Sequence, residues 1–195
     1  MLAAASQARS KVVLAHIRAA TDGDRSAANR HPFQFGPLLF MHNGGVPDWR
    51  EHFASALRCP DLRRLLAGET DSEFAGALFA QHLAGGDVCL RSKEFEPAEV
   101  IGAMRRTVRD IEGTIARLTG ASHGSLNFAA SDGRTAVVTR FRTAANDEPP
   151  SLYFAITGST ERAAAARLLD SQAAVVGEQR AACAARSDVR VWAPL

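Results

Sequence analysis

An apolar stripe along residues 101–118 constrains the fold of this 195-residue chain more than any other feature of its sequence. The apolar positions recur at alternating spacings of three and four residues, which is the period of one face of an α-helix. They are Ile101, Met104, Val108, Ile111, Ile115 and Leu118. Because a helix with one apolar face must bury it against another layer, we expect a packed globular domain with this helix covering its core.

Short apolar runs, most of them rich in β-branched or aromatic residues, predict the strands. They span residues 12–18, 38–42, 125–131, 135–142 and 151–157. Asp132-Gly133 lies between the third and the fourth run and is a strong signal for a hairpin turn. The second run should end abruptly at Asn43-Gly44-Gly45, because Asn and Gly favour tight turns.

Further helices are predicted on both sides of the long one. One spans residues 47–57 and begins with a proline, whose missing N–H is harmless in the first turn. Thr70-Asp71-Ser72-Glu73 has the capping-box pattern that starts a second helix, and an alanine-rich run predicts a third over residues 160–174. Residues 19–37 and 85–97 have little periodicity, so we expect them to be loops.

The charge balance and the cysteines exclude several classes of protein. Lys+Arg total 23 against 21 Asp+Glu, so the chain lacks the large basic excess of nucleic-acid and anionic-membrane binders. No apolar run reaches the roughly 18 residues that a membrane-spanning helix needs. The three cysteines are far apart, so neither a disulfide framework nor a structural zinc site is expected, and we predict a cytoplasmic protein. Residues 1–20 share the composition of a transit peptide, but the strand predicted at 12–18 fits them better.

Four polar or backbone groups could act together on one ligand. Arg18 ends a predicted strand, Asn43 and Gly44 follow another, and Asp71 lies at a helix start. Each also has a structural explanation. Arg18 could form a surface ion pair, Asn43 and Gly44 could form a tight turn, and Asp71 could interact with the helix dipole. Together they supply a guanidinium, an amide with a backbone donor, and a carboxylate. This set matches the carboxylate and ammonium groups of an amino acid, with donors left for a developing oxyanion.

The order of these segments resembles a class II glutamine amidotransferase domain. The matching segments are Ala15-His16-Ile17-Arg18-Ala19-Ala20-Thr21, Asn29-Arg30-His31-Pro32-Phe33, Phe40-Met41-His42-Asn43-Gly44 and Thr70-Asp71-Ser72-Glu73. That family belongs to the N-terminal-nucleophile hydrolases, so the resemblance implies an α+β fold, the four-layer αββα sandwich. It implies one domain over residues 1–195, with the strongest match over 11–158. Because residues 175–195 diverge and the family's opening strand is not found, we expect the sandwich to be incomplete at both ends.

Three later segments narrow the resemblance within the family. They are Ser125-Leu126-Asn127-Phe128, residues 135–142 and residues 149–154. They look most similar to the amidotransferase-like subunit of the fungal glutathione-degradation complex and to the γ-glutamyl amidohydrolases of ergothioneine synthesis. The resemblance therefore points to glutamine or a γ-glutamyl peptide as the small-molecule partner, and to a second protein as a further partner.

The resemblance implies a role for each residue that matches a motif. Arg18 would bind the α-carboxylate of a γ-glutamyl group, and Asp71 would bind its α-amino group. The side chain of Asn43 and the N–H of Gly44 would form the oxyanion hole. His31 would help to shape the loop over the substrate.

The histidines of the matching segments have two explanations that the sequence leaves open. For His16, His31 and His42, a structural role is as well supported as a chemical one. Their spacings fit no common metal-binding motif, so we expect no metal ion. The resemblance implies no other cofactor.

The sequence departs from the family pattern at the nucleophile. The family uses a cysteine at position 1 of the mature chain, whose own α-amino group is the general base, so an internal cysteine cannot replace it. Here the sequence begins Met-Leu, and its first cysteine, Cys59, is expected to be structural. We therefore expect a truncated, inactive form of an amidohydrolase acting on glutamine or a γ-glutamyl peptide such as glutathione. The alternative is a catalytically dead γ-glutamyl-binding or scaffold subunit that docks a partner enzyme.

Overall fold

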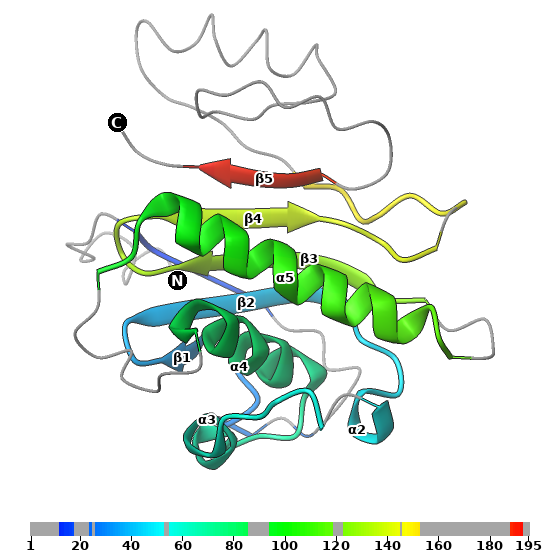
Figure 1. The fold of residues 1–195 in the computed structure, drawn as a ribbon, viewed down its shortest axis with the longest axis horizontal. Helices are drawn as coiled ribbons and strands as arrows, with labels where there is room; N and C mark the ends of the chain where they lie inside the picture. The colour runs from blue at the N-terminus through cyan, green and yellow to red at the C-terminus, as the bar shows by residue number, and fades with distance from the viewer. Residues whose placement is uncertain are drawn as a thin grey trace, which may run out of the picture.

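An antiparallel sheet organises the computed structural model of the chain (Figure 1). The structure describes residues 12–17, 24, 26–52, 55–85, 94–118, 123–144 and 146–152, and the backbone of residues 188–192. Within these residues the sheet has five strands in the order β1-β2-β3-β4-β5, each antiparallel to its neighbour. The mixture of helices with this sheet confirms the predicted α+β class.

The helices are inserted between two strands that are neighbours in the sheet. The strands are β1 Phe33–Phe35, β2 Leu38–Gly45, β3 Ser125–Ser131, β4 Ala136–Arg140 and β5 Asp188–Trp192. The helices α2 Trp49–His52, α3 Pro60–Leu65, α4 Asp71–Ala84 and α5 Pro97–Ile115 come between β2 and β3 in the chain. The register places Asn43 opposite Asn127 and Gly45 opposite Ser125. The chain therefore leaves the sheet at Gly45, forms these helices, and returns to the sheet at Ser125, opposite Gly45.

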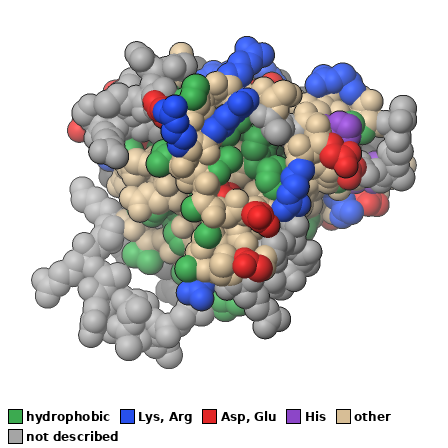
Figure 2. Space-filling model, turned by 90° about the horizontal axis from the view of Figure 1, so that it is seen from below, with side chains coloured by type: hydrophobic (Ala, Val, Ile, Leu, Met, Phe, Trp, Pro, Cys, Tyr) green, Lys and Arg blue, Asp and Glu red, His purple; other side chains and the backbone are tan. Residues whose placement is uncertain are grey.

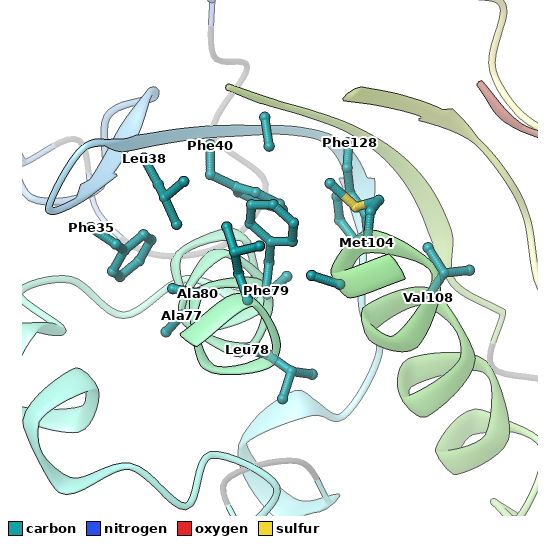
Figure 3. Packing of buried hydrophobic residues seen from close by; sticks show 14 of the residues in the cluster. Phe35, Leu38, Phe40, Ala77, Leu78, Phe79, Ala80, Met104, Val108 and Phe128 are labelled. Atoms are coloured by element: carbon teal, nitrogen blue, oxygen red, sulfur yellow. The ribbon is translucent and has the colours of Figure 1, made fainter. Parts of the chain in front are cut away.

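The hydrophobic core lies between one face of the sheet and helices α4 and α5 (Figure 1). Phe40 of β2 and Phe128 of β3 point from the sheet toward Phe79 of α4 and Met104 of α5 (Figure 3). The ring centroid of Phe40 lies 6.0 Å from that of Phe79 and 5.1 Å from that of Phe128. These separations are typical of attractive aromatic pairs. All four side chains are buried, so these contacts tie both helices to the sheet.

Helix α4 is buried on nearly every side. Of its residues, Gln81, His82 and Ala84 are partly exposed and the others are buried. Its sequence fits this position, because small and apolar residues fill most of the helix after its polar first turn. Gly76 lies against the rings of Phe35 and Phe40, so the helix backbone approaches the sheet closely at this point.

Helix α5 confirms the prediction made from the apolar stripe. Met104, Val108, Ile111 and Ile115 are buried, while Ile101 is partly buried and packs on the core. The helix begins at Pro97, four residues before the stripe, because Glu99 accepts a hydrogen bond from the Glu96 N–H at 2.9 Å and caps the first turn.

The predicted hairpin over residues 125–142 is also confirmed. Strands β3 and β4 pair antiparallel around Asp132-Gly133, and Gly133 has a φ of 87°, a conformation that favours glycine. The Asp132 carboxylate accepts hydrogen bonds from the N–H groups of Arg134 and Thr135, which fixes the turn. The prediction for residues 38–42 is confirmed too, although β2 continues through Gly45 because Asn43, Gly44 and Gly45 all pair with β3.

Two predictions of secondary structure are wrong within the described residues. Residues 12–17 form no strand, and the side chains of Val13 and Ile17 are 59% and 79% exposed. A β-branched composition favours extended backbone but does not supply a strand to pair with. The helix predicted over 47–57 is helical at Trp49–His52, because Asp48 has a left-handed φ of 51° and residues 55–57 do not continue the helix.

Other predictions fall partly or wholly outside the described residues. Residues 151 and 152 are not in a strand, and the rest of the strand predicted there lies outside, as does the helix predicted over 160–174. Sequence reasoning also missed β1, α3 and β5. The three residues of β1 pair with the start of β2, and such a short strand shows no period. Strand β5 lies in the divergent C-terminal segment and pairs with β4 over five residues.

The surface agrees with the balanced charge of the sequence. On the face that Figure 2 shows, acidic and basic side chains are interspersed, with hydrophobic side chains between them. Among the residues that the structure describes, no helix combines the length and the apolar character needed to cross a membrane.

The close approach of α4 to the sheet predicts opposite effects of two glycine substitutions. A Cβ at Gly76 would lie 2.7 Å from a ring carbon of Phe35 and 3.0 Å from one of Phe40. Gly76→Ala should gain about 1 kcal/mol of helix propensity but lose about 1–3 kcal/mol to overpacking, so its Tm should fall. In the control Gly113→Ala, the atom nearest to the new Cβ is a guanidinium nitrogen of Arg117 at 3.8 Å, so the Tm should stay the same or rise. Thermal unfolding by circular dichroism measures both, and an unchanged Tm for Gly76→Ala would contradict this packing.

Candidate functional site

A cavity of about 570 Å³ opens where β2 ends and α4 begins. We call it the β2-end cavity. It is lined by Gly44, Gly45, Val46, Pro47, Asp48, Trp49, Arg50, Glu51, Asp71, His123 and Ser125. The end of one strand, the start of its neighbour and the start of a buried helix therefore meet at one place. Two residues that the sequence singled out, Gly44 and Asp71, belong to this lining.

Asp71 is a buried carboxylate at the start of α4. Its side chain follows the N-cap Thr70, and the positive end of the helix dipole favours a negative charge there. Its Oδ2 accepts a hydrogen bond from the Val46 N–H at 2.7 Å, and its Oδ1 lies 3.1 Å from the Ser72 hydroxyl. The residue is 8% exposed, and its exposed part faces the β2-end cavity. These contacts fix the carboxylate in place and leave it able to bind a cation from the cavity.

Gly44 brings the backbone of β2 close to that of β3. Its φ is 150°, and a Cβ built on it would lie 1.9 Å from the Ser125 carbonyl oxygen. A side chain is therefore excluded at this position by both conformation and space. Asn43 precedes it, has an exposed side chain, and pairs in register with Asn127. A glycine is thus required where the strand end borders the cavity.

His42 lies behind the cavity and contacts both β3 and the start of α4. Its Nε2 is 2.8 Å from the Ser125 carbonyl oxygen, and its Nδ1 is 3.0 Å from the Ser72 hydroxyl. The ring is buried and lies 4.8 Å from the Phe128 ring, centroid to centroid. Burial lowers the pKa of His42 below its usual value, although the nearby Asp71 carboxylate opposes this shift. A buried neutral imidazole therefore connects β2, β3 and the start of α4.

His31 contacts β2 from the segment before β1. Its Nδ1 accepts a hydrogen bond from the His42 N–H at 3.4 Å, and its ring lies 4.2 Å from that of His16 and 4.7 Å from that of Phe33. His31 is not part of the cavity lining. His31 is therefore linked to the cavity through His42, and its role in shaping the loop over the substrate stays a prediction.

The loop before α4 is held by polar contacts that the sequence did not reveal. The Thr70 hydroxyl accepts a hydrogen bond from the Glu73 N–H at 3.2 Å, which confirms the predicted N-cap. The Glu73 carboxylate, however, accepts from the N–H groups of Ala67 and Gly68 at 2.9 and 2.8 Å. Asn29 adds a further bond, because its Oδ1 accepts from the Glu69 N–H at 2.9 Å. The start of α4 is therefore anchored on both sides.

Comparison with known proteins identifies the family of the chain. Residues 1–157 match the family described as glutamine amidotransferases class-II. The chain belongs to this family. It is 36% identical over 163 residues to the probable glutamine amidotransferase DUG3 of Saccharomyces cerevisiae, a match that covers 80% of this chain and 46% of that protein. These findings confirm the resemblance drawn from the ordered sequence segments.

A solved structure supports the same assignment. A glutamine aminotransferase class-II domain protein from Silicibacter pomeroyi superposes with a TM-score of 0.50 and 26% sequence identity. The match covers 66% of this chain and 54% of that one. The chain thus spans about half the length of these two relatives.

Of two further residues considered in the sequence, the structure describes Cys59 but not Arg18. Arg18 is outside the described residues, so its distance to Asp71 is not defined. Cys59 is the N-cap residue of α3, is 8% exposed, and its N–H donates to the Gln81 Oε1 at 2.9 Å. It does not line the β2-end cavity, which fits the structural role expected of it. Across the described ranges, no group of three or more His, Cys, Asp or Glu side chains is placed to hold a metal ion.

Aromatic and charged side chains at one border of the cavity were missed by sequence reasoning. The Arg50 guanidinium lies 4.6 Å from the centroid of the Trp49 ring and donates a hydrogen bond to the Glu69 carbonyl. Trp49 in turn stacks on Phe74 of α4, with 5.7 Å between ring centroids. The sequence signal for this border was a tryptophan five residues after the Asn-Gly pair. A sequence pattern does not show, however, which surface such a residue faces.

The two adjacent glycines at the cavity predict a sharp contrast in stability. Gly44→Ala should lower the free energy of unfolding by about 3 kcal/mol or more, because the new methyl group would overlap the Ser125 carbonyl. Gly45→Ala should leave it unchanged or slightly higher, since the nearest atom to its Cβ would be an Asp71 oxygen at 3.8 Å. Urea unfolding of both variants measures the difference. Equal stabilities would show that β2 and β3 do not approach as closely as described here.

Proposed function

We propose that this domain recognises the glutamyl group of glutamine or of a γ-glutamyl peptide such as glutathione, and that the whole protein hydrolyses the γ-amide bond. The observation that carries the proposal is that Asp71 and Gly44 line the same cavity in a chain of the class-II amidotransferase family. A fixed carboxylate and a strand end without a side chain meet there. These are features that amino-acid binding and acyl-transfer chemistry both use.

The Asp71 carboxylate is suited to bind the α-ammonium group of such a ligand. It is held by the Val46 N–H and faces the cavity, so a ligand ammonium would complete its coordination. A charge-assisted hydrogen bond of this kind is strong where water is largely excluded. The proposed partner of the ligand's α-carboxylate is Arg18, whose planar guanidinium can donate two parallel hydrogen bonds.

Asn43 and Gly44 are the proposed oxyanion donors. An oxyanion hole needs donors that are in place before the reaction, because moving them during the reaction would cost free energy. The pairing of both residues with β3 fixes the backbone at this point. The exposed Asn43 amide and the Gly44 N–H are therefore assigned to the oxygen that becomes negative during amide hydrolysis.

A second proposal is a subunit that binds a γ-glutamyl group but does not hydrolyse it. It is favoured by the position of Cys59, the one cysteine among the described residues, which is buried away from the cavity. This subunit would dock a partner enzyme, and both proposals place the protein in the cytoplasm. The protein purified from its source organism decides between the two proposals. Release of glutamate from L-glutamine together with an N-terminal cysteine by mass spectrometry supports the hydrolase, and binding without release supports the binding subunit.

Removing the charge of Asp71 should abolish most of the affinity for L-glutamate. Asp71→Asn keeps an oxygen for the Val46 N–H but loses the charge that attracts the ammonium, so Kd should rise at least about tenfold. The control is Glu51→Gln, which removes a carboxylate from the same cavity lining at an exposed position. Isothermal titration calorimetry measures both, and equal effects of the two substitutions would refute the specific role of Asp71.

Arg18→Lys should also weaken the binding of L-glutamate, although it keeps the positive charge. A lysine ammonium cannot reproduce the two parallel hydrogen bonds of a guanidinium, so Kd should rise about tenfold. The matched control is Arg30→Lys, a change of the same kind in another of the matching segments. Calorimetry with L-glutamate again gives the measurement. If Arg18→Lys binds as tightly as the unmodified chain, the α-carboxylate has another partner.

A further inference from the structure

We propose that His42 is a positioning residue that controls, through Ser72, whether the Asp71 carboxylate can bind the ammonium group of a ligand. This inference rests on the proposed function, which assigns that ammonium to Asp71. The three side chains form one network, since His42 Nδ1 lies 3.0 Å from Ser72 Oγ, and Ser72 Oγ lies 3.1 Å from Asp71 Oδ1. Asp71 lines the β2-end cavity, whereas His42 and Ser72 lie behind it.

The Ser125 carbonyl determines which ring nitrogen of His42 always carries a hydrogen. His42 Nε2 lies 2.8 Å from that oxygen, and a carbonyl oxygen can accept a hydrogen bond but cannot donate one. Nε2 must therefore be the donor. In the neutral ring Nδ1 is then an acceptor, and in the imidazolium it is a donor. The two charge states of the ring therefore differ only in whether Nδ1 carries a hydrogen.

Ser72 has one hydroxyl hydrogen for two acceptors when His42 is neutral. It can donate to His42 Nδ1 or to Asp71 Oδ1, but not to both at once. The His42 side chain is fully buried behind the β2-end cavity, so water has little access to Nδ1 when the Ser72 hydroxyl donates to Asp71. A buried acceptor without a donor costs free energy. With a neutral His42, the network therefore has one hydroxyl hydrogen for two acceptors.

Two different cations can supply the missing donor. If His42 gains a second proton, Nδ1 donates to Ser72, whose hydroxyl then donates to Asp71. If a ligand places its ammonium on Asp71 from the cavity, the Ser72 hydroxyl is released and can donate to the neutral Nδ1. Both cations together would place two positive charges next to one carboxylate. The ligand ammonium and the second proton of His42 therefore compete.

The charged and titratable groups around His42 set the direction of this competition. Asp71 faces it from α4, with Oδ2 3.9 Å from Nδ1, and favours the imidazolium. His16 opposes protonation when it is charged, and His31 accepts the His42 N–H from the segment before β1. An ammonium bound to Asp71 offsets the charge that favours the imidazolium, so a bound ligand should lower the pKa of His42 further. By linkage, binding should weaken as the pH falls through that pKa.

An NMR titration of the unmodified chain tests this directly. The pKa of His42, followed by its imidazole Cε1 proton, should be about one unit lower with saturating L-glutamate than without it. Glutarate has the same two carboxylates but no amino group, so it should leave the pKa of His42 unchanged. His82 is an internal reference, since it titrates on α4 next to Asp110 and away from the cavity. An equal pKa in the free and glutamate-bound chain would overturn the proposal.

Calorimetry between about pH 5 and pH 8 gives a second test. The Kd for L-glutamate should rise by about tenfold in total as the pH falls through the pKa of His42, because a pKa that is one unit lower in the bound chain corresponds to a tenfold loss of affinity. In His42→Gln this dependence should disappear, because a glutamine amide can donate to the Ser125 carbonyl but does not titrate. The control His82→Gln should keep it. Circular dichroism confirms that each variant is folded, and the NMR titration stands alone if His42→Gln does not fold.

The outcomes separate this proposal from the function on which it rests. If L-glutamate binds and Asp71→Asn weakens it, but His42→Gln keeps the full pH dependence, the role of His42 is refuted and the proposed function stands. If Asp71→Asn does not weaken binding, or L-glutamate does not bind, the proposed function itself fails, and the role of His42 fails with it. Loss of the pH dependence in His42→Gln alone supports both.

Discussion

The hydrogen bond from the Val46 N–H to the Asp71 carboxylate joins the two parts of the chain on which the site depends. Val46 directly follows β2, and Asp71 is the first residue of α4, so the bond fixes the strand end against the helix start. It is 2.7 Å long, buried, and made by a charged acceptor, which places it among the stronger hydrogen bonds in proteins. Both residues of this bond line the β2-end cavity, which opens at the junction of the strand end and the helix start.

The precision of the site comes from the core beneath it. Phe40 and Phe79 lock α4 to β2, and Gly76 lets the helix approach the sheet without a gap. A helix buried on nearly every side cannot slide without disturbing many contacts, because protein interiors are close-packed. The packing of the same helix in the core, at Gly76 and Phe79, therefore fixes the position of Asp71. This explains how a polar group at the end of a helix can be held rigidly while its exposed edge faces a cavity.

Features that depend on contacts within a few residues were predicted from the sequence more reliably than features that depend on long-range pairing. Helix α5, the hairpin of β3 and β4, and the Thr70 N-cap follow from contacts within a few residues, and each was predicted correctly. Strands β1 and β5 depend on a partner elsewhere in the chain, and a period in one segment does not reveal that partner. The same limit applies to the site. Asp71 and Gly44 were identified as members of a set, whereas the network of His42 and Ser72 requires knowing that β2, β3 and α4 meet.

Two acidic side chains in the first turn of α4 show why a sequence pattern alone does not assign a role. Asp71 and Glu73 lie two residues apart, both are buried, and both benefit from the helix N-terminus. The two oxygens of Glu73 accept hydrogen bonds from the backbone N–H groups of Ala67 and Gly68, so its charge is used within the loop. One oxygen of Asp71 accepts a hydrogen bond from the Val46 N–H, and the residue lines the cavity. The capping pattern is the same for both, and the difference arises from which backbone each carboxylate meets. A structural and a ligand-binding carboxylate can therefore come from one helix turn.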